Sequence, residues 1–230
     1  MSKKKNEKKY RLIVTAHPDD ETLFMGGLIM TEKSLPWKVI CVTDGNADGQ
    51  GVKRKKQFLK ACREMGVKEV EMWTFPDQFA MRLDVDKLMR QLSLLPLPKE
   101  VFTHGIIGEY GHPHHQDVSW AVHQCFLKIC PVMSVAYNSL PEKIVKLSKA
   151  VFIKKNRILS HIYGSETRRF SHLIPTTFVE GFMRVGIKEV EAVYKFLVDG
   201  KKPRNSAIQV YQGHWHQFSH RFSQPIAREF

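Results

Sequence analysis

The stretch LIVTAHPDDE, residues 12–21, decides the fold of this chain and also predicts where its chemistry lies. Its apolar beginning is a short strand, and the strand ends abruptly in one histidine and three carboxylates. Functional side chains in α/β proteins follow the carboxyl ends of such strands. His17 and Asp20 are three residues apart, and Pro18 between them suits the first position of a helix. The stretch therefore predicts half of a metal site.

Strand-like and helix-like segments alternate through the first 140 residues of the chain. Strands are predicted at 11–16, 38–43, 67–73, 100–104 and 133–137, and helices at 20–33, 53–65, 84–94 and 117–129. The strands are almost continuously apolar, which is typical of parallel sheets covered on both faces. We therefore expect an α/β fold: a doubly wound, Rossmann-like, mostly parallel sheet with helices on both faces.

The length of 230 residues fits a single domain, and 43% hydrophobic residues are enough for one sizeable core. Residues 1–9 are predicted to be a basic, flexible tail, and residues 10–230 one domain. Its core is expected at about 10–140, followed by a variable part at about 141–230 in which only residues 187–198 clearly predict a helix.

Cysteine usage and hydropathy exclude several classes of protein. Cys41, Cys62, Cys125 and Cys130 lie far apart without any CxxC spacing, so no zinc ribbon or redox motif is encoded, and we expect reduced, buried thiols. No stretch reaches the roughly 18 apolar residues of a membrane span. The apolar run after the basic start is too short for an export signal, so we expect a cytoplasmic protein.

A formal net charge of +13 raises the question of a nucleic-acid partner, because basic surfaces attract phosphate backbones. Groups of lysines and arginines lie in the first nine residues, in the run 53–56 and scattered through 143–169. No helix-turn-helix or aromatic RNA-stacking motif accompanies them. A solvated basic surface is therefore favoured over a nucleic-acid site, with attraction to an anionic substrate or envelope surface as a third option.

A second histidine-rich motif, EYGHPHHQD at residues 109–117, follows the fourth predicted strand. His112 and His115 are spaced i, i+3 across a proline, in a loop where a third ligand for the first motif would lie. Two explanations do not involve a metal ion. Surface histidines can cluster by chance, and acids at positions 19–21 can complement the positive end of a helix. Neither accounts for both motifs, so a shared metal site is the favoured interpretation.

The two motifs together resemble the PIG-L or LmbE-like family of zinc-dependent N-acetylglucosaminyl deacetylases, over roughly residues 10–140. The resemblance implies that His17, Asp20 and His115 bind zinc. It also implies that Asp19 is the general base and that His112 assists the transition state.

Weaker matches to the same family concern substrate contacts. The resemblance places Arg54 in an Arg-x-x-Glu-x-x-x-Ala helix, although Gln57 stands where the family has glutamate. Asp77 matches an aspartate that faces substrate hydroxyls, and Tyr110 matches a position that helps to stabilise the tetrahedral oxygen. Asp44 is interpreted as a turn residue near the site.

A third histidine group consists of His214, His216 and His220 near the C-terminus. The family comparison gives it no role, and ordinary surface or packing histidines are favoured over a sugar-stacking or metal-binding function.

The ligand set itself predicts hydrolytic chemistry, because two imidazoles and one carboxylate leave an open position on a tetrahedral zinc for water. Asp19 would accept the proton of that water, and His112 with Tyr110 would stabilise the oxyanion. We therefore expect a zinc-dependent N-deacetylase of an N-acetylglucosamine-type sugar or conjugate. Alternatives are hydrolysis of another amide or acyl group, use of iron or manganese, or a polyanion-binding protein with a vestigial metal site.

Overall fold

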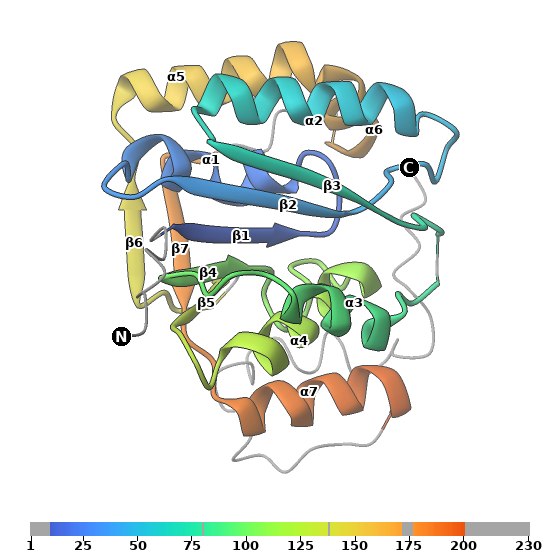
Figure 1. Ribbon diagram of the computed structural model, residues 1–230. Coiled ribbons are helices and arrows are strands. Elements are labelled where there is room, and N and C mark those ends of the chain that lie inside the picture. Colours follow the sequence, from blue (N-terminus) through green and yellow to red (C-terminus); the bar gives the residue numbers. More distant parts are fainter. Residues whose placement is uncertain (1–9, 80, 138, 172–176, 201–230) are drawn as a thin grey trace, which may run out of the picture.

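The computed structural model describes residues 10–79, 81–137, 139–171 and 177–200, and its centre is a seven-stranded sheet with the order β3-β2-β1-β4-β5-β7-β6 (Figure 1). Five neighbouring strands are parallel: β1 (Arg11–Thr15), β2 (Trp37–Thr43), β3 (Glu69–Phe75), β4 (Glu100–Thr103) and β5 (Val132–Val135). β7 (Val179–Met183) adds antiparallel to β5, and β6 (Lys143–Lys146) pairs antiparallel with β7. The predicted α/β fold with a mostly parallel sheet is confirmed, and the C-terminal part extends that sheet with two strands that the sequence did not predict.

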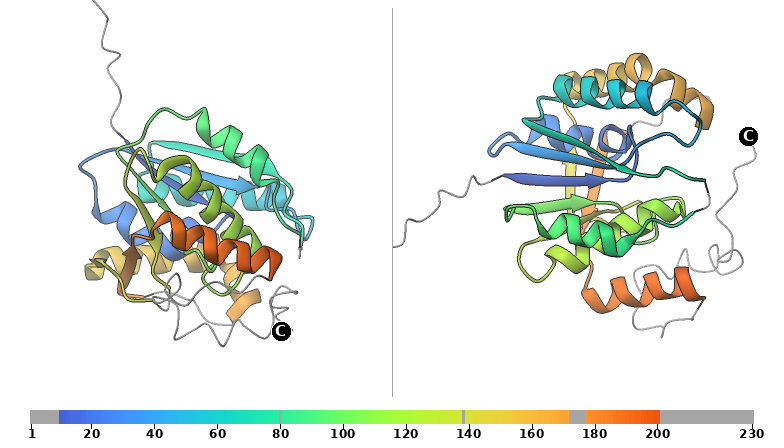
Figure 2. Two further views of the ribbon diagram at one scale, coloured as in Figure 1. Left: turned by 90° about the horizontal axis from the view of Figure 1, so that it is seen from below. Right: turned by 45° about the vertical axis from the view of Figure 1, so that its right-hand side comes forward.

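Helices cover both faces of the sheet (Figures 1 and 2). One face carries α1 (Asp20–Thr31), α2 (Gly51–Met65), α5 (Lys149–Arg157) and α6 (Gly164–Ser171), with a π-helical turn at Ile158–Ile162 between the last two. The other face carries α3 (Val85–Ser93), α4 (Pro113–Phe126) and α7 (Ile187–Asp199). Alternation along β1 supplies both cores, because Ile13 joins the cluster under α1 and α2 whereas Leu12 and Val14 join the one under α3 and α4.

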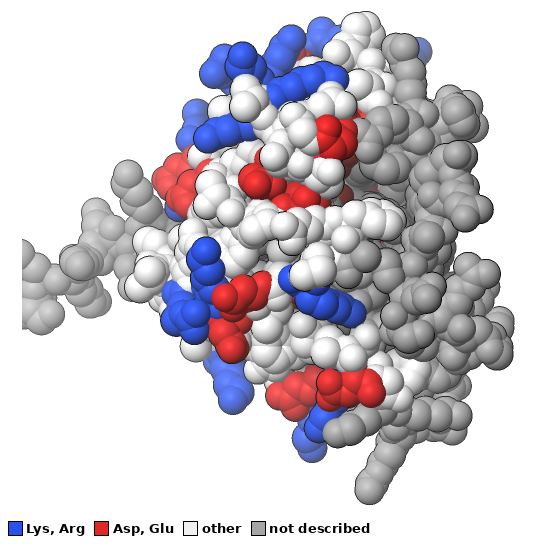
Figure 3. Space-filling view, turned by 90° about the vertical axis from the view of Figure 1, so that its right-hand side faces the viewer, with Lys and Arg blue, Asp and Glu red and all other residues white. Residues whose placement is uncertain are grey.

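The strand order places a topological switch point beside β1. The chain runs from β1 through β2 to β3 on one side and then returns to add β4 and β5 on the other, so β1 pairs with both β2 and β4. Loops that leave β1 and β4 therefore diverge, and ligands of doubly wound sheets bind at this place. Figure 3 views the molecule from this carboxyl edge, with lysine and arginine side chains gathered at the top, where α2 and α5 lie.

One helix start agrees with the prediction and a second differs from it. Helix α1 begins at Asp20, as predicted, but Asp19 is its N-cap, so Pro18 does not occupy the first helical position. Helix α4 begins at Pro113, four residues before the predicted start at 117, and this proline occupies the first turn, where its missing N–H costs nothing. His114 and His115 therefore lie in the first turn of a helix rather than in a loop.

The other predictions made for the whole chain concern its cysteines, membrane spans and terminal segments. All four cysteines are free, but Cys125 and Cys130 are only partly buried, so the expectation of four buried thiols is wrong for these two. Among the described residues, no helix combines the length and hydrophobicity that a membrane span needs. The N-terminal tail and the histidines at 214, 216 and 220 lie outside the described residues.

Candidate metal centre

Three side chains from two strand ends form a buried triangle of ligand atoms: His17, Asp20 and His115. His17 Nδ1 lies 3.1 Å from His115 Nε2 and 3.4 Å from Asp20 Oδ2, and the third side, between His115 Nε2 and Asp20 Oδ2, is 3.4 Å. Ligand atoms at about 2.0–2.1 Å from a tetrahedral ion lie about 3.3–3.4 Å apart. The predicted ligand set is therefore brought together with dimensions that fit a divalent transition metal.

The turn after β1 positions His17 and Asp20 of the triangle. The backbone N–H of His17 donates a hydrogen bond of 2.7 Å to Asp20 Oδ2, which holds the carboxylate against the histidine. Asp19 adopts φ 116°, a backbone conformation that L residues rarely take. Among the described residues, Glu109 is the other non-glycine residue with positive φ, at 54°, and it also lies at the site. Strained backbone of this kind concentrates at functional sites.

Glu109 organises the imidazoles behind the triangle. Its Oε2 accepts hydrogen bonds from His115 Nδ1 at 2.6 Å and from His104 Nδ1 at 3.0 Å, while its Oε1 accepts the backbone N–H of Gly105 at 2.7 Å. Burial raises the pKa of Glu109, but the facing histidines overcome this and lower it to about 2. An ionised Glu109 fixes the proton of His115 on Nδ1 and leaves Nε2 free for a metal ion.

The electrostatics of the triangle favour a cation. Burial lowers the pKa of His17, yet hydrogen bonds to Asp20 and Asp77 and the charges of those carboxylates raise it to about 9. The pKa of Asp20 is held well below its ordinary range, because His115 and His104 outweigh the effect of burial. The raised pKa of His17 reports the negative potential of two buried carboxylates, which a bound divalent ion would neutralise, and the lowered pKa of Asp20 keeps this candidate ligand ionised.

His112 lies beside the triangle as the N-cap of α4. Its Nδ1 accepts the backbone N–H of His114 at 3.2 Å, which leaves the proton of the neutral ring on Nε2. Burial, together with the nearby His17 and His115, lowers the pKa of His112 well below the ordinary value, so the ring is neutral near pH 7. Gly108 permits this turn, since it has φ +73° and a Cβ there would lie 2.6 Å from the His112 carbonyl oxygen.

Tyr110 is half-buried at the same place. Its ring centroid lies 5.3 Å from that of His115 and 6.2 Å from that of His112, in edge contacts. The structure thus places Tyr110 against the two histidines of the second motif.

Arg54 and Asp77 form a buried network of ion pairs with Asp19, which the family resemblance implies is the general base. Arg54 is 7% exposed, and its Nη2 donates to the Pro18 carbonyl oxygen at 3.0 Å. The guanidinium lies 3.8 Å from Asp19 Oδ2, 3.4 Å from Asp77 Oδ2 and 3.8 Å from Glu166 Oε2. Burial raises the pKa of Asp19 well above the ordinary value of an aspartate, and Arg54 opposes that rise. Arg54 is therefore buried at the site and does not lie on a solvated face of α2.

Asp44 and Gln57 have structural roles. Asp44 Oδ1 accepts the backbone N–H groups of Asn46 and Asp77, each at 3.0 Å, so it ties the loops after β2 and β3 together as a turn residue. Gln57 donates from Nε2 to the Ile162 carbonyl oxygen at 2.6 Å and thereby links α2 to the π-helical turn.

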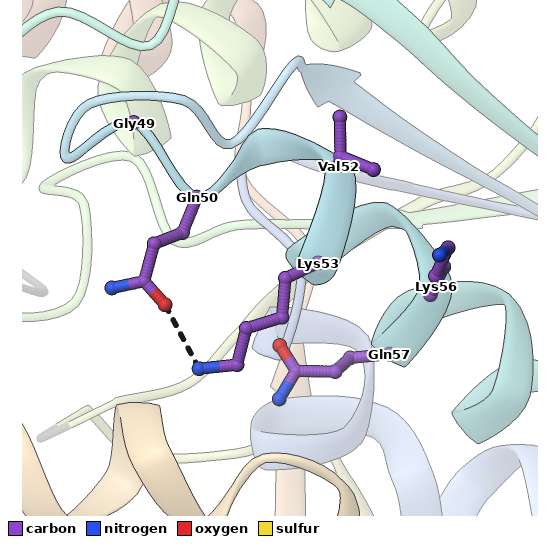
Figure 4. Close-up of a pocket in the computed structure, with 6 residues that line it drawn as sticks. All are labelled: Gly49, Gln50, Val52, Lys53, Lys56 and Gln57. Atoms are coloured by element: carbon purple, nitrogen blue, oxygen red, sulfur yellow. Dashed lines mark hydrogen bonds between the residues drawn. The ribbon is translucent and has the colours of Figure 1, made fainter.

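A separate hollow of about 570 Å³ lies along the N-terminal half of α2 (Figure 4). Its lining consists of Gly49, Gln50, Val52, Lys53, Lys56 and Gln57. Lys53 Nζ donates to Gln50 Oε1 at 2.8 Å along its rim. No residue of the triangle lines this hollow, so it is distinct from the candidate metal centre.

Sequence reasoning assigned no role to His104, Glu109, His114 or Glu166, although the structure places all four at the site. The sequence could have indicated His104 and Glu109, because they lie at the end of a predicted strand and in the second histidine motif, respectively. No such indication exists for Glu166, since it comes from the C-terminal part and reaches Arg54 only through the packing of α6.

The chain is similar to several known proteins. The PIG-L family model, described as GlcNAc-PI de-N-acetylase, matches residues 12–126. A Bos taurus N-acetylglucosaminyl-phosphatidylinositol de-N-acetylase is 33% identical over 122 residues, which cover 48% of this chain and 48% of that protein. A probable N-acetyl-alpha-D-glucosaminyl L-malate deacetylase 2 of Bacillus cereus is 29% identical over 167 residues, or 64% of this chain and 69% of that protein.

The fold is also found among solved structures. The N,N'-diacetylchitobiose deacetylase of Pyrococcus horikoshii aligns with a TM-score of 0.57 and 19% identity, covering 78% of this chain and 84% of that one. The matched segment spans about half the length of the bovine relative. With the family model covering the two motifs, α1 to α4 and the first four strands, this chain belongs to the PIG-L family.

Proposed function

We propose that this protein is a metal-dependent hydrolase that removes the N-acetyl group from an N-acetylglucosamine-type sugar or conjugate. The observation that carries the proposal is the triangle of His17, Asp20 and His115 with the buried carboxylate of Asp19 directly beside it. The names of the bovine and Bacillus relatives support an N-acetylated sugar as the substrate class.

The triangle would hold the metal ion, which we propose to be zinc because imidazole and carboxylate ligands in a tetrahedral arrangement suit it. A divalent ion held by these residues would lower the pKa of a bound water and polarise a carbonyl group. The chain's own residues then manage the protons and the developing charge.

Asp19 is the proposed proton acceptor. It is 6% exposed, its neighbours in sequence are ligand Asp20 and Pro18, and Arg54 keeps a positive charge 3.8 Å from its Oδ2. As water adds to the acetamide carbon, its proton passes to Asp19. The same carboxyl group returns that proton to the amine nitrogen when the C–N bond breaks, which yields acetate and a free amine.

His112 is the proposed oxyanion donor. Its neutral ring carries the proton on Nε2, so it can donate a hydrogen bond to the carbonyl oxygen as negative charge develops there. Tyr110, which packs on the His112 and His115 rings, can supply a second donor. Asp77 lies between His17 and Arg54 and is proposed to face the sugar hydroxyls.

Acetate release from N-acetylglucosamine conjugates, measured with and without a chelator, tests the proposal. We expect activity to vanish with the chelator and return with zinc, and the same assay with Fe²⁺ or Mn²⁺ compares the alternative metals. Asp19→Asn should lower kcat by about 10²–10⁴-fold while metal content stays at the wild-type level. Asparagine is chosen because it keeps the size of the side chain and removes its charge.

The matched control is Asp86→Asn, which removes an exposed carboxylate on α3 and should leave kcat unchanged. Activity that is indifferent to both the chelator and Asp19→Asn would refute the mechanism. Turnover of other amides but not of acetamido sugars would favour a different acyl substrate on the same centre. Salt-sensitive polyanion binding without turnover would favour the binding-protein alternative.

A further inference from the structure

His17 presents both of its ring nitrogens to groups of ligand atoms, and only Nδ1 belongs to the centre described above. On the opposite edge of the ring, His17 Nε2 lies 3.0 Å from His114 Nδ1 and 3.5 Å from Asp77 Oδ1. The third side, between His114 Nδ1 and Asp77 Oδ1, is 3.6 Å. His17, His114 and Asp77 are each less than a tenth exposed.

The two triangles match in composition and size. Each consists of two imidazole nitrogens and one carboxylate oxygen, with sides of 3.1, 3.4 and 3.4 Å around Nδ1 and of 3.0, 3.5 and 3.6 Å around Nε2. A tetrahedral ion with ligands at about 2.0–2.2 Å needs sides of about 3.3–3.6 Å. A ring nitrogen of His112 also lies within 4.8 Å of those of His17 and His114, so the His112 ring borders this second triangle.

His114 holds the correct nitrogen toward His17. The side chain also hydrogen-bonds the backbone of Met81. Because Nδ1 faces His17 Nε2, we infer that Nε2–H makes this bond, which leaves the Nδ1 lone pair facing the second triangle. When only the first triangle holds an ion, His17 Nε2–H can donate a hydrogen bond to this lone pair over 3.0 Å. The same contact therefore gives His17 Nε2–H an acceptor when the second ion is absent. A second ion would take the place of that proton, which is released to solvent.

We propose that the chain binds a second divalent transition-metal ion through His17 Nε2, His114 Nδ1 and Asp77 Oδ1, and that this ion inhibits the enzyme. The binding of the ion is independent of the proposed deacetylation, whereas its inhibitory effect rests on that proposed function. Inhibition follows from the position, because the second ion would engage Asp77, the proposed sugar contact, and stand beside the His112 ring, whose centroid lies 4.5 Å from that of His17.

The test counts ions in the full-length protein without an affinity tag. Wild-type protein dialysed against excess zinc should hold one more equivalent than His114→Asn, by elemental analysis. The asparagine amide oxygen replaces Nδ1 as an acceptor for His17 Nε2–H but is a poor zinc ligand, so the first site should remain filled. Replacement by Co²⁺ gives a second readout, since the visible absorption of wild type should continue to change beyond the first equivalent and that of His114→Asn should not.

The matched control is His161→Asn, the same change at an exposed histidine of the π-helical turn, which should retain the wild-type ion count. Any ion bound by histidines 214, 216 and 220 is common to all three proteins and cancels in the comparison. If activity is found, micromolar excess zinc should lower it in wild type and His161→Asn but not in His114→Asn.

Equal ion counts in wild type and His114→Asn would overturn the second site whether or not the protein is a deacetylase. If His114→Asn is too unstable to purify, Asp77→Asn is measured in its place with the same expected loss of one equivalent. An extra ion in wild type without any inhibition would overturn the inhibitory role. Loss of all zinc from His114→Asn would likewise refute the proposal, because it would make His114 part of the first site.

Discussion

Glu109 accepts a hydrogen bond from Nδ1 of His115 over 2.6 Å, and this contact fixes which nitrogen His115 presents to the metal triangle. We predict that Glu109→Gln weakens zinc affinity about 10–100-fold, because the amide cannot accept from His115 and His104 with the strength of a carboxylate. Competition with a chromophoric chelator measures the affinity. Glu142→Gln, which alters an exposed partner of Arg184, is the control, and unchanged affinity in Glu109→Gln would contradict this role.

Arg54 is predicted to contribute to the stability of the fold as well as to the charge balance at Asp19. Its buried guanidinium lies within 3.8 Å of Asp19, Asp77 and Glu166, so Arg54→Gln leaves three carboxylates without their shared cation. We expect a loss of about 3–5 kcal/mol in the free energy of unfolding, measured by urea denaturation with metal removed. Lys55→Gln, one residue further along α2 and exposed, should cost less than about 0.5 kcal/mol. A similar cost in both variants would show that Arg54 does not hold the acids together.

The ion pair between Lys155 and Glu180 is predicted to secure α1 to the C-terminal part of the sheet. Lys155 Nζ donates to Glu180 Oε1 at 2.6 Å and to the Leu23 carbonyl oxygen at 2.8 Å, and the Glu180 carboxylate accepts the backbone N–H groups of Gly27 and Leu28. Lys155 is fully buried, so Lys155→Met should destabilise the fold by about 3–5 kcal/mol because Glu180 keeps an uncompensated charge.

The matched control is Lys154→Met, the same substitution at the adjacent residue of α5. The double variant Lys155→Met with Glu180→Gln should recover part of the loss, since no buried charge then remains. A double variant no more stable than Lys155→Met alone would indicate that the lysine acts by packing and not by charge.

His123 is predicted to make stability depend on pH away from the metal centre. Its Nδ1–H donates to the Ser119 carbonyl oxygen at 2.6 Å, its Nε2 lies 3.1 Å from Ser134 Oγ, and burial lowers its pKa to about 4. Since the folded pKa is below the unfolded value of about 6.5, the contribution is fully present above pH 6.5 and is lost as the pH falls toward 4.

The loss attributable to His123 should reach about 3 kcal/mol. Urea denaturation of wild type and His123→Gln across pH 4–8 measures it, because the difference between their unfolding free energies should shrink as the pH falls. A difference that stays constant over this range would contradict the assignment. His161→Gln, at an exposed histidine, should follow wild type throughout.

The sequence predicted the parallel half of the fold and its edge of polar residues because both depend on local patterns. Continuous apolar runs at β1, β2 and β4 indicate strands buried on both faces, and the acids and histidines that follow them must meet where parallel strands end. The antiparallel pair β6 and β7 was missed, because its short strands depend on β5 for pairing and one of them lies at the edge of the sheet.

What the sequence by itself determined is the set of chemical groups at the site: His17, Asp19 and Asp20 after β1, and His112 and His115 after β4. Tertiary structure decided how those groups are oriented and charged. Glu109 sets the tautomer of His115, Arg54 compensates Asp19 from α2, and His114 turns toward the far nitrogen of His17. Such relationships join residues up to about a hundred positions apart through side-chain directions, which no local pattern of hydrophobicity or spacing encodes.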